Sequence, residues 1–199
     1  MGRDRASRTD AKPLRLFVAV DLPDEVRERV ERGVEPVRER YPSGRWVPLE
    51  NQHITLKFLG ATWPSLVDAV LACVGDVAAR HQPFETRVST LGAFPSARRA
   101  RVLWVGLEDP AARLRRIAVD LDDTLAASFP PEKRAFTPHL TVARFDPPVR
   151  LDGELVDLAV ESSPFDVSWL TLYRSHLQRP APRYEATATF PLGRGARDR

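Results

Sequence analysis

Two stretches of the chain, NQHITLKFLG at residues 51–60 and TPHLTVARFD at residues 137–146, share one pattern and decide the fold. Each contains a histidine, an aliphatic residue, a threonine and a second aliphatic residue in that order, beginning at His53 and at His139. Short apolar runs of this kind, rich in branched side chains, are typical of β-strands. The two histidines are 86 positions apart, and the same spacing relates other segments of the chain.

The segments that precede the two histidines also match. Arg15 begins the apolar run RLFVAV 38 positions before the first histidine, and Arg101 begins RVLWVGL 38 positions before the second. Apolar residues at intervals of three and four predict an amphipathic helix after each run, starting at Asp24 and at Pro110. Strand, helix and histidine strand recur in one order, which indicates an internal duplication and two similar lobes related by a pseudo-two-fold axis.

The remaining patterns complete one domain. A further amphipathic helix is predicted at residues 66–81. Alternating patterns predict additional strands at residues 84–94, 165–175 and 183–192. We therefore expect a bilobal α+β domain at residues 13–193, with repeats at about 14–94 and 100–192.

Composition limits the class of protein. A chain of 199 residues with 43% hydrophobic content can bury a core. It contains no apolar run of about 18 residues, and its first dozen residues lack the apolar segment of a signal peptide. We therefore expect a cytoplasmic protein, monomeric and without membrane contact. The one cysteine, Cys73, lies in an apolar helical pattern and is expected to be a buried thiol.

The net charge of +3 comes from the two ends of the chain and not from its body. Residues 1–12 and 194–199 each carry +2, which leaves −1 for the body. Both ends are polar and are predicted to be disordered tails. This distribution argues against a broad basic face for duplex nucleic acid and leaves only local clusters. Arg98 and Arg99 form one such cluster, which either meets a polynucleotide backbone or is simply solvated.

The histidine stretches predict a site for phosphorus chemistry. Side chains two apart share one face of a strand, so His53 and Thr55 lie together, as do His139 and Thr141. In-line displacement at phosphorus needs a base on the attacking side and an acid on the leaving side, and two imidazoles supply both. The threonine hydroxyls can donate hydrogen bonds to the phosphate oxygens, where negative charge concentrates.

Other polar residues are weaker candidates. Lys57 shares the parity of His53 and could add a cation, although its counterpart is Ala143. Two histidines without a carboxylate on the same strand face supply too few ligands for a metal ion. The remaining histidines are expected to be structural or on the surface. The acidic residues of the helix predicted to start at Pro110 are expected to form a solvated face. These residues are His81, His176, Asp120, Asp122 and Asp123.

These motifs, in this order, resemble the two-histidine phosphoesterase superfamily, and within it the RNA 2′,3′-cyclic phosphodiesterases once named 2′-5′ RNA ligases. The fragments that carry the resemblance run from Leu14 to Leu192 and are RLFVAVDLP, HITLKFLG, RVLWVGL, FTPHLTVARF, LYRSHLQRPAPRYEA and TFPL. The resemblance implies antiparallel sheets that line a central cleft, with helices outside and one H-x-T-x motif from each lobe.

The resemblance also implies an activity. It is the hydrolysis of a 2′,3′-cyclic phosphate, at an RNA end or on a nucleoside, to a 2′-phosphate without a metal or other cofactor. By this similarity His53 is the proton donor to the leaving 3′ oxygen, and His139 is the proton acceptor that activates water. Thr55 and Thr141 would hold the phosphate.

Two further residues are implied by similarity. Phe58 would stack near the base and Arg144 would reach the phosphate, but strand parity places both on the face opposite the histidines. They fit only if each strand ends or twists before them. Three alternative functions stay open, namely reversible 2′-5′ joining of RNA ends, a non-catalytic module that binds nucleotides or RNA, and a metal-dependent hydrolase.

Overall fold

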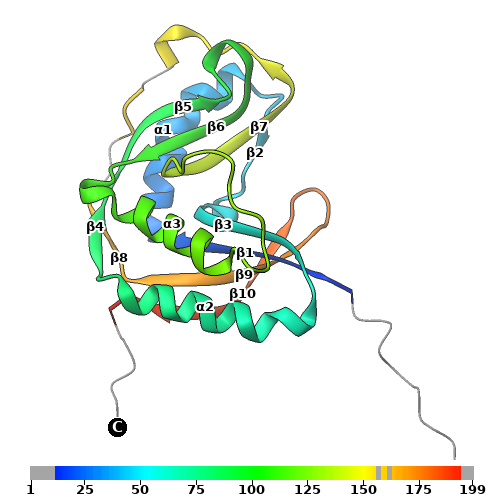
Figure 1. Ribbon diagram of the computed structural model, residues 1–199. Helices are drawn as coiled ribbons and strands as arrows, with labels where there is room; N and C mark the ends of the chain where they lie inside the picture. The colour runs from blue at the N-terminus through cyan, green and yellow to red at the C-terminus, as the bar shows by residue number, and fades with distance from the viewer. Residues whose placement is uncertain (1–11, 156–157, 161–162, 194–199) are drawn as a thin grey trace, which may run out of the picture.

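The structure is a computed structural model that describes residues 12–155, 158–160 and 163–193. The expected tails, at residues 1–12 and 194–199, lie outside the described residues apart from Lys12. Two four-stranded antiparallel sheets form the body of the molecule, which confirms the α+β class (Figure 1). None of the helices described is long and apolar enough to cross a membrane.

The first sheet has the strand order β10-β9-β1-β3 and contains the first histidine strand. Its strands are β1 (Leu14–Asp21), β3 (His53–Thr62), β9 (Trp169–His176) and β10 (Arg183–Pro191). The second sheet has the order β2-β7-β6-β5 and contains the second histidine strand. Its strands are β2 (Arg45–Trp46), β5 (Val88–Phe94), β6 (Ala100–Leu107) and β7 (His139–Val149). A small third sheet pairs β4 (Phe84–Thr86) with β8 (Phe165–Val167).

Each large sheet takes strands from both halves of the chain. β5 comes from the first half but pairs with β6 in the second sheet, whereas β9 and β10 come from the end of the chain and complete the first. The two lobes expected from the repeat are therefore not two consecutive halves of the sequence. Antiparallel pairing depends on which edges are free rather than on the order of the strands, so the repeat alone does not give this exchange.

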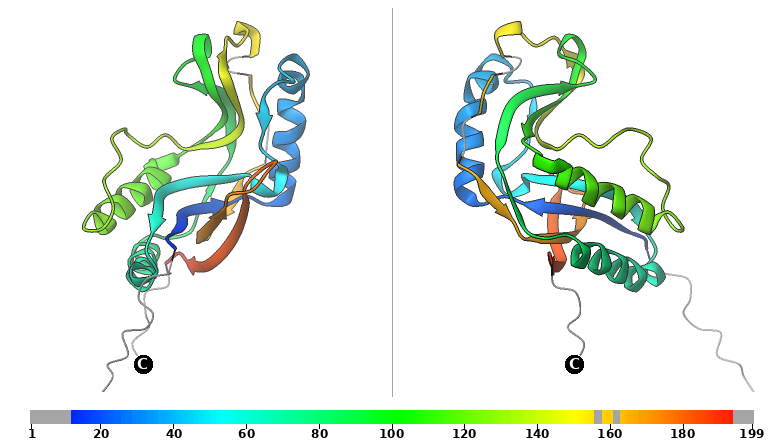
Figure 2. Two further views of the ribbon diagram at one scale, coloured as in Figure 1. Left: turned by 90° about the vertical axis from the view of Figure 1, so that its right-hand side faces the viewer. Right: turned by 60° about the vertical axis from the view of Figure 1, so that its left-hand side comes forward.

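The helices cover the outer faces of the sheets. α1 (Asp24–Arg40) lies beside the second sheet, whereas α2 (Val67–Arg80) and α3 (Arg113–Leu125) lie against the first (Figure 1; Figure 2). Their buried residues recur at intervals of three and four, and in α1 these are all valines, which gives the core stripe that the sequence predicts. They are Val26, Val30, Val34 and Val37.

Short 3-10 turns separate several of these elements. They are η1 (Leu49–Asn51), η2 (Pro64–Leu66), η3 (Ala97–Arg99), η4 (Pro110–Ala112) and η5 (Gly153–Leu155). The turn at η4 corrects the predicted start of a helix at Pro110, because two left-handed alanines follow the proline and α3 begins only at Arg113. Asp109 caps the helix as its carboxylate accepts the backbone N–H of Leu114 at 2.8 Å.

Cys73 also departs from its prediction. The thiol is partly rather than fully buried, and its Sγ lies 3.9 Å from the backbone oxygen of Thr124. The residue still packs against the main core, which unites apolar side chains from both sheets and all three helices. A periodic pattern places a residue on a helix face, but the neighbouring helix determines how completely it is covered.

Candidate active site

A β-bulge in β3 determines which side chains share the face of His53. Thr55 and Lys57 pair with consecutive residues of β1, which leaves Leu56 as an extra residue in the strand. An extra residue reverses the alternation of side chains beyond it. Leu56 and Lys57 are both buried, whereas Phe58 is 59% exposed and returns to the histidine face. The parity prediction is therefore wrong for both Lys57 and Phe58.

The second histidine strand contains the same irregularity at the equivalent position. In β7, Thr141 and Ala143 pair with consecutive residues of β6, so that Val142 is the extra residue. Val142 and Ala143 are buried, and Arg144 is exposed on the side of His139. The bulge thus brings Arg144 to the histidine face, where parity in a regular strand would have excluded it.

Lys57 forms a buried ion pair instead of contributing to the histidine face. Its side chain is only 1% exposed, and its ammonium pairs with Asp122 of α3 while donating to the backbone oxygen of Pro130 at 2.9 Å. The second oxygen of Asp122 accepts the backbone N–H of Glu132 at 2.9 Å. The predicted solvated role of Asp122 is therefore wrong, because this carboxylate ties α3 and the following loop to β3.

The two less favoured histidines have local partners. His81 lies 2.8 Å from Asp120, which is therefore not a purely solvated carboxylate, and His176 lies 2.6 Å from Glu185. Asp123 is exposed, as expected for a residue on the solvated face of α3. The structural or surface interpretation of His81 and His176 is thus confirmed.

Aromatic rings hold the imidazole of His53. Phe17 is stacked on it with the ring centroids 4.7 Å apart, and Tyr184 meets it edge-on at 5.1 Å. Phe58 lies 6.0 Å from Phe17 on the same face. The Nδ1 atom of His53 is 2.8 Å from the backbone oxygen of Asn51. When Nδ1 carries the proton and donates it to this oxygen, Nε2 is the nitrogen left for substrate.

His139 has a parallel environment built from other residues. Phe94 meets its ring edge-on at 5.1 Å, and Trp104 lies 6.2 Å away. Its Nδ1 is 2.7 Å from the backbone oxygen of Thr137, again two residues before the histidine. Both imidazoles are therefore oriented by a backbone carbonyl at Nδ1 and an aromatic wall, with Nε2 available.

The residue opposite each histidine differs between the sheets. Asp21 of β1 pairs with His53, whereas Gly106 of β6 pairs with His139. Asp21 is held in place because it accepts hydrogen bonds from the Thr171 hydroxyl at 2.7 Å and the Tyr173 hydroxyl at 2.5 Å. A carboxylate thus faces one imidazole and no side chain faces the other.

Burial and nearby charges alter the titration of both imidazoles. Burial lowers the pKa of His53 to about 4, while the hydrogen bond to Asn51 and the charge of Asp21 oppose that change. The pKa of His139 is also lowered, again chiefly by burial. The positive charge of Arg144 also contributes to the lowering of both pKa values. A pKa of about 4 leaves His53 largely neutral at pH 7, and the lowered pKa of His139 also favours its neutral form.

The threonines of the two motifs lie on the same faces as the histidines. Thr55 and Thr141 are partly buried, each two residues beyond its histidine and before the bulge. Within the described ranges, neither hydroxyl forms a hydrogen bond with another protein group. Both hydroxyls are therefore free to donate to a ligand.

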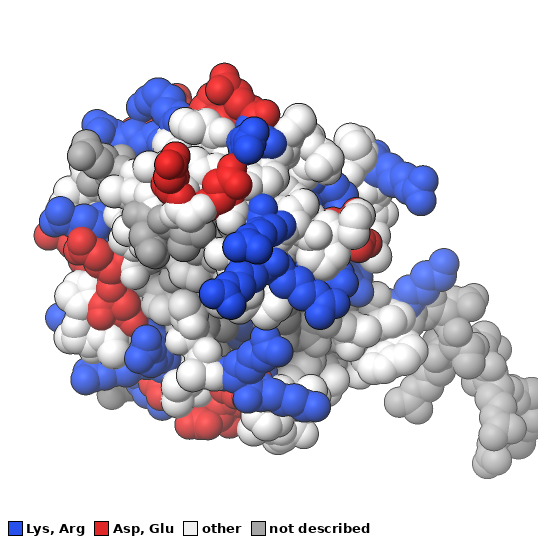
Figure 3. Space-filling model, turned by 90° about the horizontal axis from the view of Figure 1, so that it is seen from above, with Lys and Arg blue, Asp and Glu red and all other residues white. Residues whose placement is uncertain are grey.

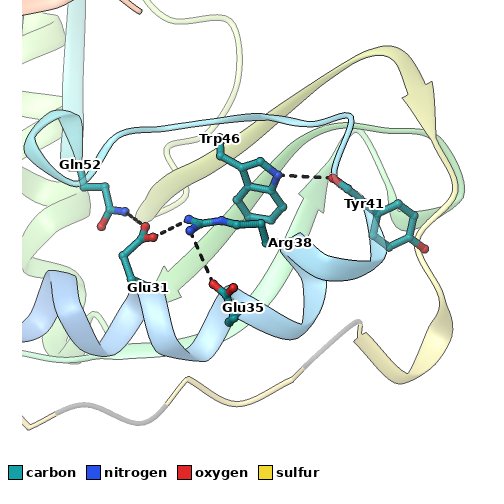
Figure 4. A network of polar contacts seen from close by, with 6 residues as sticks. All are labelled: Glu31, Glu35, Arg38, Tyr41, Trp46 and Gln52. Carbon is teal, nitrogen blue, oxygen red and sulfur yellow. Dashed lines mark hydrogen bonds and ion pairs between the residues drawn. The ribbon is translucent and has the colours of Figure 1, made fainter.

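A polar network runs from the residue before β3, through α1, to β2 of the second sheet (Figure 4). Gln52, which immediately precedes His53, donates to Glu31 at 2.5 Å, and Glu31 forms an ion pair with Arg38. The guanidinium of Arg38 lies 5.0 Å above the ring of Trp46, a residue of β2 in the second sheet. This network joins the start of β3 to the strand beside β7.

Sequence reasoning missed these supporting residues for an identifiable reason. Phe17, Trp104 and Asp21 lie in strands that the apolar pattern predicts, but the pattern does not show which histidine each would face. Only the strand pairing brings them next to the imidazoles. The presence of an aromatic residue in each of the runs RLFVAV and RVLWVGL was the available signal.

The cluster at Arg98 and Arg99 lies apart from the histidines. Both residues are exposed in η3, and Arg98 lines a surface cavity of about 570 Å³ with Arg40 and Arg150. Lys and Arg side chains gather near the middle of the molecular face seen from above (Figure 3). Asp152 also lines this cavity and pairs with Arg40 at 2.9 Å, so its charge is mixed. Among the described residues no group of three or more His, Cys, Asp or Glu side chains could hold a metal ion.

Comparison with known proteins gives the same relationship as the motifs. The sequence profile described as the 2′-5′ RNA ligase superfamily matches residues 22–179. An RNA 2′,3′-cyclic phosphodiesterase of Methanothermobacter thermautotrophicus is 34% identical, over 90% of this chain and 99% of the relative. One of Geobacillus stearothermophilus is 32% identical over 88% of this chain, which spans only 56% of that longer relative.

Solved structures agree with these sequence matches. The crystal structure of E. coli LigT in apo form superposes with a TM-score of 0.75 at 28% identity, covering 92% of this chain and all of that one. TT0787 of Thermus thermophilus gives a TM-score of 0.74 at 29% identity, covering 90% of this chain and 98% of that one. The predicted fold class and resemblance are confirmed, and the chain belongs to the 2′-5′ RNA ligase superfamily.

Proposed function

We propose that the protein hydrolyses 2′,3′-cyclic phosphates, at RNA ends or on nucleosides, to 2′-phosphates. The observation that carries this proposal is the repetition of one bulged histidine strand in two sheets, each with the histidine Nδ1 next to a backbone oxygen. Two oriented imidazoles supply the acid and the base that displacement at phosphorus requires, so no step depends on a metal ion. The relatives named RNA 2′,3′-cyclic phosphodiesterase support the same activity.

In this proposal the two histidines have different roles. His53 protonates the leaving 3′ oxygen, and His139 removes a proton from the attacking water. The carboxylate of Asp21 favours a protonated ring at His53, whereas Gly106 offers His139 no such partner. In the free protein burial outweighs this charge at His53, so the asymmetry supports an acid in the first sheet and a base in the second only when the substrate phosphate is bound.

The remaining residues bind the substrate. The hydroxyls of Thr55 and Thr141 donate to the non-bridging oxygens, and Arg144 pairs with the phosphate charge. These donors act where negative charge develops in the transition state. Phe58 offers an exposed ring on which the terminal base can stack. E. coli LigT, 27% identical to this chain, has been crystallised with 3′-AMP, a mononucleotide, which supports nucleotide binding at the corresponding site.

The low pKa of His53 means that the imidazole must take up a proton when substrate binds before it can act as the acid. In the free protein a pKa of about 4 leaves the acid largely unprotonated at pH 7. A bound phosphodiester adds a negative charge beside the imidazoles, and a nearby opposite charge raises the pKa of a histidine. Substrate binding and proton uptake at His53 are therefore coupled in this proposal.

We further propose that the protein works as a monomer, because one chain contributes both histidine strands, and that it works in the cytoplasm. The activity is tested by incubating it with a 2′,3′-cyclic nucleotide and with cyclic-ended RNA in the presence of a chelator, followed by identification of the product. A 2′-phosphate supports the proposal, and a 3′-phosphate would show that the leaving oxygen is misassigned. No turnover would exclude the enzyme, and turnover lost only in chelator would indicate a metal-dependent hydrolase.

Reversible 2′-5′ ligation is the second candidate. It uses the same groups, because it differs only in whether water or a 5′-hydroxyl attacks the cyclic phosphate, and the superfamily description names it. Adding an RNA with a free 5′-hydroxyl to the same incubation separates the two reactions, since ligation yields a longer product.

A further inference from the structure

Two arginines lie directly opposite each other at the edge of the second sheet. Arg45 of β2 pairs with Arg144 of β7. Like charges in directly opposed positions destabilise an antiparallel pair. In the described part of the chain neither guanidinium forms an ion pair with a carboxylate, and both side chains are exposed. The pair therefore concentrates positive charge without an internal anion to offset it.

The packing of the neighbouring residues directs both arginines to the histidine face. Trp46, next to Arg45, lies under Arg38 of α1, and its ring nitrogen is 3.4 Å from the backbone oxygen of Tyr41. Phe145, next to Arg144, is buried against the ring of Tyr41 at 6.1 Å. Because adjacent side chains in a strand point to opposite faces, Arg45 and Arg144 point away from α1.

The edge strand that carries Arg45 is held firmly. The backbone N–H of Val47 donates to the oxygen of Val142 at 2.8 Å, and Trp46 is clamped between β7 and α1. Arg45 is therefore presented from a fixed backbone, which reduces the entropy lost when its guanidinium binds a ligand.

The two arginines lie at different distances from the reacting phosphate. Because Val142 is the extra residue of the bulge, Arg144 lies two pairing positions beyond Thr141, about 7 Å along the strand at about 3.4 Å per position. Arg45 lies one strand further out, by about 4.8 Å. A phosphate held by the threonines is therefore within closer reach of Arg144 than of Arg45.

We propose that Arg45, beside Arg144, binds the phosphodiester that precedes the terminal nucleotide of an RNA. This inference rests on the proposed function and adds the substrate length that the site recognises. A guanidinium matches the paired oxygens of a phosphodiester, and such a group sits at the next position of an RNA chain but is absent from a cyclic mononucleotide. Arg45 thus distinguishes an RNA end from a free nucleotide.

The test compares a cyclic mononucleotide with a dinucleotide that ends in the same cyclic nucleotide, since the two differ by one phosphodiester and one nucleoside. The wild-type protein is expected to have a lower KM for the dinucleotide. Arg45→Gln should raise that KM about tenfold with little change in kcat, and leave the mononucleotide constants unaltered. The slope of log KM against log salt for the dinucleotide should fall in magnitude by about 0.7.

Arg32→Gln is the matched control, because Arg32 is an exposed arginine of α1 paired with Glu28 at 4.0 Å. It should change neither substrate's constants. An equal effect of Arg45→Gln on both substrates, or on neither, would overturn the inference. Absence of turnover by the wild-type protein would contradict the proposed function instead. Calorimetry then measures the binding of the 2′-phosphorylated dinucleotide and mononucleotide to the same variants. Arg45→Gln should weaken binding of the dinucleotide only.

Discussion

At the scale of single residues, the two imidazoles are alike in orientation and unlike in charge environment. Each has Nδ1 near a backbone oxygen two residues earlier in the chain. Only His53 has a carboxylate, Asp21, at the opposed position of the neighbouring strand. Because a negative charge stabilises imidazolium, Asp21 opposes the effect of burial on the pKa of His53, and no carboxylate does so at His139.

The Asp21→Asn variant tests this asymmetry. Removing the carboxylate charge removes an influence that raises the pKa of His53, so that pKa should fall below its wild-type value of about 4. The titration of His139 should be unchanged, because Gly106 occupies the opposed position there. NMR titration of the labelled imidazole carbons measures both values in one sample.

His139 serves as the internal control for that titration. Asparagine keeps one carbonyl that can accept from Thr171 or Tyr173, so gross rearrangement of β1 is not expected. An unchanged or higher pKa at His53 would show that Asp21 has only a structural role. Turnover of cyclic-ended RNA should also decrease, since a weaker hold on the proton leaves less of the acid form.

At the scale of secondary-structure elements, the bulges explain what the sequence could and could not predict. His53, Thr55 and their counterparts precede the bulge, so the two-residue period places them correctly. Phe58 and Arg144 follow it, and the extra residue shifts them to the other face. The bulges cannot be predicted from the apolar pattern, because the extra residues, Leu56 and Val142, are as hydrophobic as any other strand residue.

The same bulge turns Lys57 into the core, where it needs Asp122. The ammonium is 1% exposed and the carboxylate 18% exposed, so loss of either charge leaves the other poorly solvated. The pair also fixes the loop after α3, because Asp122 accepts the N–H of Glu132 and Lys57 donates to Pro130. That loop leads into β7 and so into the strand of the second histidine.

Lys57→Met should destabilise the protein strongly. Leaving Asp122 without its cation is expected to lower the free energy of unfolding by about 3 kcal/mol, as measured by urea denaturation. Lys57→Met combined with Asp122→Leu should recover part of that loss, because no buried charge then remains.

The comparison for this prediction is the exposed pair of Arg32 and Glu28. Arg32→Met should cost less than about 1 kcal/mol, since solvent screens an exposed pair. If Lys57→Met proves no more costly than Arg32→Met, the ion pair does not contribute to stability as described.

At the scale of the whole molecule, the site depends on how the two sheets are joined. The repeat in the sequence predicts two histidine strands, but the exchange of β5, β9 and β10 between sheets is a property of the long-range pairing and has no local signature. The network from Gln52 through Glu31 and Arg38 to Trp46 is also long-range (Figure 4). The sequence therefore indicates which residues carry the chemistry, and only the fold shows how the two histidine strands are positioned relative to each other.

The central claim is that His53 and His139 act on one phosphate. It is tested most directly by the rate of 2′-phosphate formation from cyclic-ended RNA, in chelator, for wild type, His53→Ala, His139→Ala and the double variant. Each single substitution is predicted to lower the rate by about 10²-fold or more. The fold-decrease in the double variant should be much smaller than the product of the two single fold-decreases, because the two histidines act in one reaction. Near-wild-type activity in either folded single variant would contradict the claim.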